Sequence, residues 1–158
     1  MNRADANQIA RDLQLLYSAR TRTVRFHGLS MHPFLRDGDR VTVEEVPWEE
    51  IRRGDIVTYR GDSRYPTRRV VRKQRDRVRL WCDNWPDLRF TATREEVLGR
   101  AVALERGASR LHVADPDWQR ATRRALRAYR AAVVRRVSHR LRRAAGVVWR
   151  APQRLLRR

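Results

Sequence analysis

A serine-containing turn between two strand-like segments most restricts how this chain can fold. The turn, Gly28–Pro33, reads Gly-Leu-Ser-Met-His-Pro, and the sequence Asp-Gly-Asp follows it at 37–39. Segments 23–26 and 40–43 on either side alternate polar and apolar residues, which indicates strands. Glycine permits unusual backbone angles and proline restricts them. We therefore expect the turn to hold the hydroxyl of Ser30 exposed and in a fixed direction, as a nucleophile requires.

Further short β-rich runs follow the serine turn. An Arg-Gly-Asp turn at 53–55 leads into an apolar run, and other runs lie at 67–71 and 96–102. Gly, Asp and Pro separate them throughout segment 20–107. Many short strands between turn residues are typical of an all-β domain. The sequence therefore predicts a mainly β fold.

Five motifs occur in one order across roughly residues 22–106. They are G-x-S-M-x-P, D-G-D-x-V-x-V, G-D-I-V, R-V-V and V-L-G-x-x-V. In this order and spacing the chain resembles type I signal peptidases and LexA-like self-cleaving repressors. The resemblance implies their compact β-fold and a serine endopeptidase that cleaves an extended signal or leader peptide. It also implies that Ser30 is the nucleophile and that Met31 and Pro33 contact the substrate.

The position of the general base departs from the family pattern. The resemblance places the base, a lysine or histidine, directly before the arginine of a K-R-V or H-R-V motif. Here that position is Arg68, in the sequence Thr-Arg-Arg-Val at 67–70. A guanidinium stays protonated in proteins, because its pKa lies far above neutral pH. The expected place thus holds no group that can accept the proton of Ser30.

Other residues are candidates for the missing base. His27 and His32 lie on either side of Ser30, and an unperturbed histidine titrates near neutral pH. Lys73 is the only lysine in the chain. On an unbroken strand it would face away from the side of Arg68, because successive side chains alternate, so it is the weaker candidate unless a bulge intervenes.

Two functions remain open from the sequence. The intact serine turn favours a serine endopeptidase with a substituted base. The alternative is a catalytically disarmed descendant that binds peptides as an adaptor and docks on a membrane or acidic partner. The chain holds 36 arginines and one lysine, a bias that by itself would explain arginine at position 68.

The remaining candidate polar residues point to structure. Asp39 and Asp55 lie beside turn glycines, where aspartate bonds local backbone N–H groups. Cys82-Asp83-Asn84 aligns with a Gly-Asp-Asn turn of the family, and the resemblance implies that Asp83 supports the active-site region. Cys82 is the only cysteine, so it forms no disulfide within the chain, and a zinc site needs several ligands. We expect no metal and no cofactor.

The 158 residues accommodate one domain with appendages. We expect an N-terminal helix within residues 1–21, a peptidase-like domain at 22–107 and a basic helical tail at 108–158. The helical pattern at 5–18 is too short and too charged to cross a bilayer, and it lacks the pattern of a signal peptide. The expected location is cytoplasmic, with possible attachment at the inner face of the membrane.

The tail from residue 117 holds 14 arginines and one acidic residue. Its apolar residues recur at helical spacing, namely Trp118, Ala125, Tyr129, Val133, Val137, Leu141 and Val148. Such a helix suits an anionic membrane surface, which would bury the apolar stripe while the arginines meet lipid headgroups. This is the partner we favour. Docking on the protein's own core or on an acidic protein is second, and nucleic acid is third because it does not need the apolar stripe. The peptide or protein substrate is the other expected partner, and the sequence does not indicate the oligomeric state.

Overall fold

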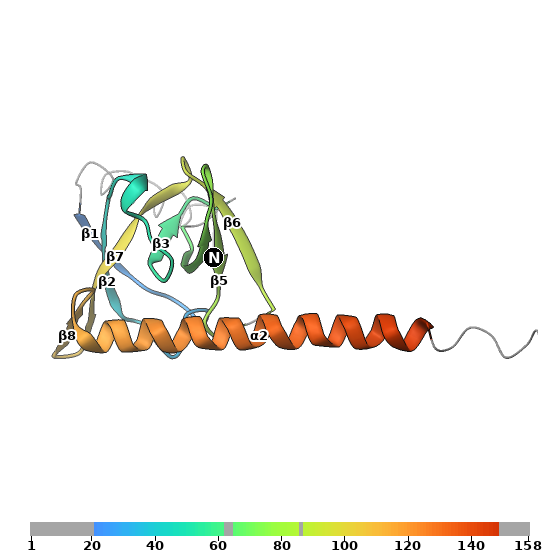
Figure 1. Cartoon of the computed structure of the whole chain (residues 1–158). Helices are drawn as coiled ribbons and strands as arrows, with labels where there is room; N and C mark the ends of the chain where they lie inside the picture. Colours follow the sequence, from blue (N-terminus) through green and yellow to red (C-terminus); the bar gives the residue numbers. More distant parts are fainter. Residues whose placement is uncertain (1–20, 62–64, 86, 149–158) are drawn as a thin grey trace, which may run out of the picture.

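The structure is a computed structural model that describes residues 21–61, 65–85 and 87–148 of the chain. The predicted helix at 5–18 lies outside the described residues. Among the described residues, eight antiparallel strands form one sheet, and one long helix follows it (Figure 1). The predicted mainly β fold is therefore confirmed.

The strands pair in the order β1-β2-β7-β3-β4-β5-β6, and β8 pairs with β7. Their bounds are β1 Thr21–Arg25, β2 Arg40–Glu44, β3 Ile56–Tyr59, β4 Thr67–Lys73, β5 Arg77–Trp81, β6 Arg89–Thr93, β7 Val97–Arg106 and β8 Ser109–His112. A 3₁₀ turn, η1, spans Trp48–Glu50, and helix α2 spans Pro116–Val148. Strand β7 pairs with β2, β3 and β8. It therefore connects β1 and β2 to the part of the sheet that β3 to β6 form.

The contact between β2 and β7 depends on a glycine. A Cβ at Gly99 would lie 2.6 Å from the carbonyl oxygen of Glu44. That distance is far shorter than a normal contact, so only glycine lets the two strands approach this closely.

Two buried clusters form the core. The first lies behind the serine turn and contains Phe26, Met31, Leu35, Val41, Val43, Ile56, Ala101, Leu104 and Trp118. The second lies at the η1 end and contains Trp48, Ile51, Val57, Tyr59, Val70, Val78, Leu80 and Ala92. In β1 and β2 every second residue points into the core, which explains their alternation, whereas all four residues of β3 are buried.

Helix α2 covers one end of the sheet with its first half. Trp118 is buried in the first core cluster and meets the ring of Phe34 edge-on, with centroids 4.9 Å apart. Further along, Tyr129 packs on Trp81, again with ring centroids 4.9 Å apart. The predicted apolar stripe therefore docks on the protein's own core over this half.

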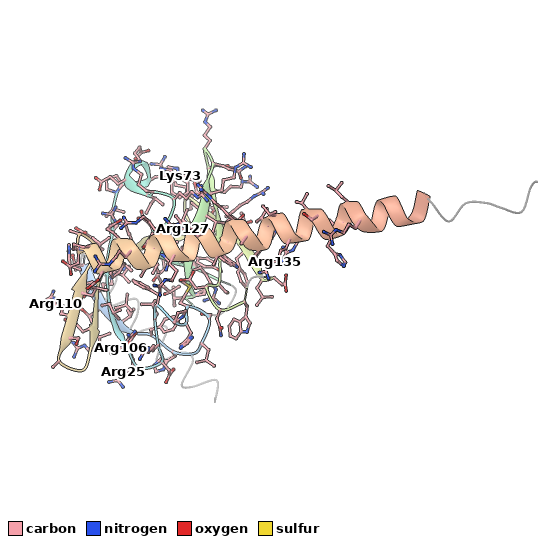
Figure 2. The ribbon with its side chains drawn as sticks, turned by 60° about the horizontal axis from the view of Figure 1, so that its bottom comes forward. Arg25, Lys73, Arg106, Arg110, Arg127 and Arg135 are labelled. Carbon is pink, nitrogen blue, oxygen red and sulfur yellow. The ribbon has the colours of Figure 1, made fainter. Side chains whose placement is uncertain are left out.

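The second half of α2 extends beyond the sheet domain. Figure 2 shows Arg127 over the domain and the helix continuing past Arg135 into open space. Val137 and Leu141 are 52% and 65% exposed there. In the part of the chain that the structure describes, no helix is both long and apolar enough to cross a membrane.

The sheet extends past the expected domain border at 107/108. That border falls in the turn between β7 and β8, and the pairing of β8 with β7 carries the sheet to His112. The helix then begins at Pro116, directly before the segment whose apolar residues recur at helical spacing. Since α2 docks on the core, its first half is part of the folded domain.

Candidate active site

The serine turn is closed by the two aspartates of the Asp-Gly-Asp sequence. Gly28 adopts a φ of 91°, a conformation that favours glycine, and its N–H donates to the Asp37 carboxylate at 2.7 Å. Asp39 accepts a 2.7 Å hydrogen bond from the N–H of Arg36. These bonds fix both ends of the loop that carries Ser30, and the peptide bond between His32 and Pro33 is cis.

Ser30 itself is enclosed, in contrast to the exposed hydroxyl that the sequence predicted. The residue is 7% exposed. Nη1 of Arg68 donates to its Oγ at 2.8 Å, and the N–H of Asn84 donates to its carbonyl oxygen at 3.2 Å. The guanidinium and the loop after β5 thus cover the turn from two sides.

Arg68 occupies the place that the family resemblance gave to the base. Its Nη1 also donates to the carbonyl of Thr67 at 2.7 Å, and its Cζ lies 5.1 Å from the centre of the Phe90 ring. A guanidinium has donors only. The contact between strand β4 and Ser30 is therefore present, but the group that makes it cannot take a proton.

The alternative bases do not contact Ser30. His27 is 72% exposed, and its Nδ1 lies 3.6 Å from the carboxylate of Asp37. His32 is exposed, and its side chain makes no hydrogen bond within the described residues. Neither imidazole is placed to accept the proton of Ser30 in this conformation.

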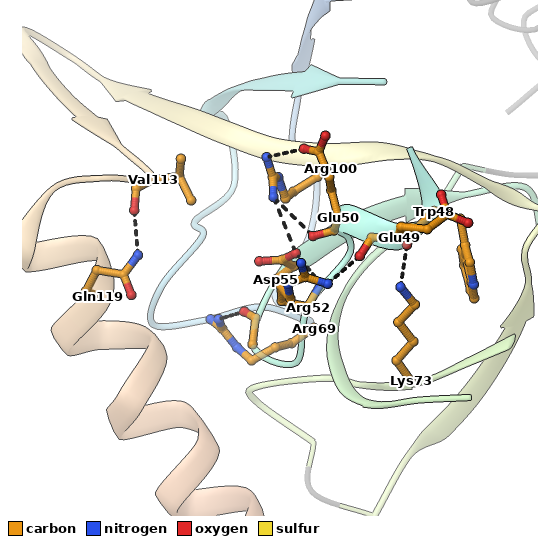
Figure 3. A network of polar contacts seen from close by, with 11 residues as sticks. Trp48, Glu49, Glu50, Arg52, Asp55, Arg69, Lys73, Arg100, Val113 and Gln119 are labelled. Atoms are coloured by element: carbon orange, nitrogen blue, oxygen red, sulfur yellow. Dashed lines mark hydrogen bonds and ion pairs between the residues drawn. The ribbon is translucent and has the colours of Figure 1, made fainter. Parts of the chain in front are cut away.

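Lys73 lies beside Trp48 of the second core cluster. Its ammonium donates to the backbone carbonyl of Trp48 and lies 5.1 Å from the centre of the Trp48 ring (Figure 3). The pairing of β4 with β5 does contain a register shift, between Val70 and Arg72. Even with this shift, Lys73 points to η1 and away from the serine turn.

The two residues expected to contact substrate have different surroundings. Met31 is fully buried in the first core cluster, so its assignment to substrate binding is corrected to a packing role. Its side chain points under the turn, whereas the next residue of the turn, His32, faces solvent. Pro33 is exposed.

The backbone of the turn offers unpaired donors. The N–H groups of Ser30 and Met31 donate to no acceptor among the residues that the structure describes. Such N–H groups are what stabilises an anionic oxygen in acyl-transfer sites. The turn thus retains donors for a negative charge, although it lacks a base.

An arginine–aspartate pair directly behind the site is the feature that the sequence analysis missed. Arg69 and Asp83 are 0% and 4% exposed and form a bidentate pair, with Nη2–Oδ2 at 2.6 Å and Nε–Oδ1 at 2.9 Å. Nη1 of Arg69 also donates to the carbonyl of Gly54 at 2.9 Å and to the hydroxyl of Thr122 at 3.3 Å. The motif identified both residues, but no signal in the sequence indicated that they pair.

The other two turn aspartates also bond local backbone. The Asp39 carboxylate accepts hydrogen bonds from Nε and Nη2 of Arg106, at 2.8 and 2.6 Å. Burial raises the pKa of Asp39, but these bonds and the N–H of Arg36 outweigh it, so the pKa lies below its ordinary value. Asp55 accepts the N–H of Arg52 at 2.7 Å, as the turn assignment expects.

The pKa of Asp55 is shifted in the opposite direction from that of Asp39. Burial raises its pKa above the ordinary value, despite the Arg52 N–H and the charge of Arg100, whose Nη1 lies 3.8 Å away (Figure 3). The carboxylate supports the turn before β3 and lies among arginines that face η1, so it is not part of the serine site.

Cys82 is fully buried next to the serine site. Burial raises the pKa of its thiol, and the positive charge of Arg68 offsets this only in part. The thiol is therefore protonated at neutral pH and is not a nucleophile. Within residues 21–61, 65–85 and 87–148, no group of three His, Cys, Asp or Glu side chains could hold a metal ion.

An antiparallel β domain with a serine on its first turn and a basic residue of β4 against the hydroxyl defines the class of serine peptidase-like domains. The family model described as Peptidase S24-like matches residues 5–102, and the chain belongs to that family. The resemblance drawn from the motifs is thereby confirmed. A comparison with curated proteins finds no match.

Proposed function

We propose that this chain is a peptide-binding member of the S24-like family in which Ser30 is not activated for attack. The observation that carries the proposal is the 2.8 Å hydrogen bond from Nη1 of Arg68 to Ser30 Oγ. In a working dyad the partner of the serine accepts its proton. Here the partner donates a hydrogen bond to the serine oxygen and cannot accept its proton.

The charge of Arg68 does not replace the missing base. A cation near a hydroxyl favours its deprotonated form, but it does not remove the proton. No imidazole or amine among the described residues contacts Ser30 Oγ, and the neighbouring Cys82 thiol is protonated. Slow or absent acylation of Ser30 is the expected consequence.

Peptide binding is supported by the exposed apolar side chains beside the site. Leu29 lies in the serine turn, and Trp85 and Leu88 lie on the loop after β5. The hydrogen bond from Asn84 to Ser30 joins these two loops. Exposed apolar side chains around a few polar groups are typical of a peptide-recognition surface.

A second candidate is the serine endopeptidase that the sequence favoured, which would cleave a signal or leader peptide. The unpaired N–H groups of Ser30 and Met31 favour it, because an active site needs them for the oxyanion. It requires a base that reaches Ser30 only in another conformation. The two candidates make opposite predictions for acylation.

A fluorophosphonate probe that acylates activated serines distinguishes them. We expect the wild type to remain unlabelled. Arg68→Lys should be labelled at least about tenfold faster, because it restores the family's base and general-base catalysis contributes about 10²–10⁴-fold. The readout is the rate of mass increase of the intact protein.

Two variants control the labelling experiment. Ser30→Ala in the Arg68→Lys background should abolish labelling. Arg72→Lys, at an exposed position of the same strand, should behave as the wild type. Labelling of the wild type that Ser30→Ala removes would refute the disarmed site and establish the peptidase.

We also propose that the free half of α2 holds the protein at an anionic membrane surface. Val134, Val137 and Leu141 are exposed at steps of three and four residues, so they share one face. Exposed arginines at 135, 140 and 142 surround this face. Apolar side chains flanked by arginines suit lipid headgroups, whereas nucleic acid would not need the apolar face.

Sedimentation with vesicles tests this attachment. We expect the full chain to bind vesicles that contain phosphatidylserine and not neutral phosphatidylcholine vesicles. The double variant Val137→Gln and Leu141→Gln keeps the charge and should bind several-fold less, since it removes buried apolar surface. His139→Gln, on the opposite face, is the matched control. Equal binding by the double variant and the control would favour an acidic protein or nucleic acid.

A further inference from the structure

One row of exposed side chains runs along α2 and changes from basic to apolar midway. Its members recur at steps of four and three residues, and they are Arg123, Arg127, Arg130, Val134, Val137 and Leu141. Steps of this size keep side chains on one side of a helix. The row is therefore basic on the half of α2 that docks on the sheet domain and apolar from the edge of the domain outward.

The sheet continues this row with two arginines on the face that carries α2. Trp81 of β5 packs on Tyr129 of the helix, and Arg79 points to the same face because it lies two residues earlier in the strand. Arg72 of β4 is paired directly with Arg79. Both arginines are exposed. Together with the arginines of the row they form the basic surface, which consists of Arg72, Arg79, Arg123, Arg127 and Arg130.

A contact of Gly54 places the two parts of the basic surface on the same side of α2. A Cβ at Gly54 would lie 3.3 Å from Cδ1 of Leu126, and the Gly54 N–H donates to the carbonyl of Val70 in β4 at 2.8 Å. Leu126 lies three residues after Arg123 and four before Arg130, so it shares their side of the helix. The arginine row of α2 therefore lies toward the C-terminal end of β4.

The charges of the basic surface are not balanced by acids. None of its arginines forms an ion pair with a residue that the structure describes. Acids close to them in sequence pair elsewhere, Asp76 with Arg77 and Asp117 with Arg120. Like charges directly opposite in a strand pair, or three and four residues apart on a helix, are destabilising. An anionic partner would remove this repulsion.

We propose that the basic surface binds the phosphate headgroups of an anionic membrane, so that the bilayer contacts β4 and β5 as well as α2. The inference rests on the proposed attachment of α2 and adds the orientation that the domain takes there. The apolar half of the row enters the boundary of the acyl chains, while the arginines stay at the level of the headgroups. A guanidinium suits that level, because its paired N–H groups match phosphate oxygens.

The apolar half of the row favours a bilayer over a nucleic acid. A nucleic acid would accept the arginines by counterion release but would leave Val134, Val137 and Leu141 in water. Binding of single strands also relies on exposed aromatic rings on which bases stack. Among the described residues, the exposed Trp85 lies on the loop after β5 and not on the strands or the helix of the basic surface.

The orientation directs the serine turn away from the bilayer. Arg69 faces α2, where its Nη1 donates to Thr122. Its neighbour Arg68 points to the other face of β4 and donates to Ser30. A membrane at the basic surface would therefore leave the serine turn uncovered.

Sedimentation of the full chain with vesicles of phosphatidylserine and phosphatidylcholine tests the inference. The double variant Arg72→Gln and Arg79→Gln leaves α2 intact. We expect it to partition onto the vesicles at least about tenfold more weakly than the wild type, because each arginine near an anionic bilayer adds to the binding free energy. Since the double variant removes a repulsive pair, it should unfold no more easily than the wild type.

Arg25→Gln with Arg110→Gln is the matched control, because both arginines are exposed, on β1 and β8. Figure 2 shows Arg25 on the opposite side of α2 from Lys73, which is the neighbour of Arg72 in β4. The control loses the same charge as the first double variant. It should weaken partitioning by less than about threefold, since it removes only screened long-range attraction.

A fluorescent label locates the bilayer independently of the charges. Cys82 is buried, so a thiol-reactive bimane will react with the cysteine of Thr91→Cys, whose position is exposed and pairs with Arg79. The variant His32→Cys labels the serine turn in the same way. With a nitroxide on the lipid headgroups, we expect quenching at position 91 and little quenching at position 32.

Two results would overturn the inference. One is equal partitioning of the Arg72→Gln and Arg79→Gln variant and its control, and the other is equal quenching at positions 91 and 32. Binding of a DNA duplex that depends on these two arginines, with vesicle binding unchanged, would assign the surface to nucleic acid instead. Failure of the proposed attachment is a separate result, because the wild type itself would then show no preference for anionic vesicles.

Discussion

Arg68 and Arg69 are neighbours on β4 but lie in opposite environments. Arg69 is fully buried, and its guanidinium is held by the carboxylate of Asp83, the carbonyl of Gly54 and the hydroxyl of Thr122. Arg68 is half-buried and contacts only neutral groups. Because adjacent residues of a strand face opposite sides, one arginine holds the domain together and the other faces the serine turn.

The substitution Asp83→Asn tests the structural role of the Arg69 pair. It leaves Arg69 buried without a counter-charge, so we expect the free energy of unfolding to fall by about 3–5 kcal/mol. Denaturant unfolding measures this change.

Asp87→Asn is the control for that measurement. Asp87 is exposed and pairs with Arg136 at the surface, so its loss should change the stability by less than about 1 kcal/mol. Equal effects of the two substitutions would contradict the role assigned to the buried pair.

The sequence predicted the contact partner of Ser30 but not the state of the hydroxyl. The motif order placed Arg68 at the base position, and the structure brings the two residues to 2.8 Å. The serine turn predicted an exposed Ser30 and the family resemblance a substrate-facing Met31, and both residues are buried. Turn residues reveal where a chain reverses, but burial depends on which distant loop covers the turn, here the one at 82–84.

Among the secondary-structure elements, α2 has two halves with different surroundings. Its first half contacts the serine loop through Trp118 and Phe34, the β3 turn through Thr122 and the end of β5 through Tyr129. These are the segments that support Ser30 and Arg68. The second half exposes Val134, Val137 and Leu141.

Trp118→Ala tests how much the docked half of α2 stabilises the domain. The side chain is 2% exposed, so its removal leaves a large cavity and should lower the free energy of unfolding by about 3–5 kcal/mol. Thermal or denaturant unfolding reports the change.

Val137→Ala, on the exposed half of the same helix, is the comparison and should change the stability by less than about 1 kcal/mol. If Trp118→Ala is equally mild, the helix is not an integral part of the folded domain.

Alternation predicted strands that expose one face, such as β1 and β2, and an apolar run after a turn predicted β3, which is buried throughout. Strand β8 was assigned to the tail, since four residues of which three are exposed give a weak pattern. The helical spacing of α2 was visible, but an apolar stripe does not reveal what covers it. The packing of Trp118 and Tyr129 on the sheet domain decides that question, and it depends on contacts distant in sequence.

Across the whole molecule, the positive charge is concentrated in the helix. The chain carries a formal net charge of +19, and the segment from residue 117 contributes most of it. Such an imbalance draws the molecule to anionic surfaces, with a strength that declines as salt increases. Composition alone showed this, whereas the division of the helix into docked and projecting halves required the structure.

The continuity of α2 has a geometric consequence. The helix is uninterrupted from Pro116 to Val148. Contacts of Trp118, Tyr129 and Arg136 hold it against the domain. From Val137 to Val148 the rod runs roughly 16 Å at about 1.5 Å per residue. A surface bound to the outer turns of α2 would therefore lie at a fixed distance and angle from Ser30.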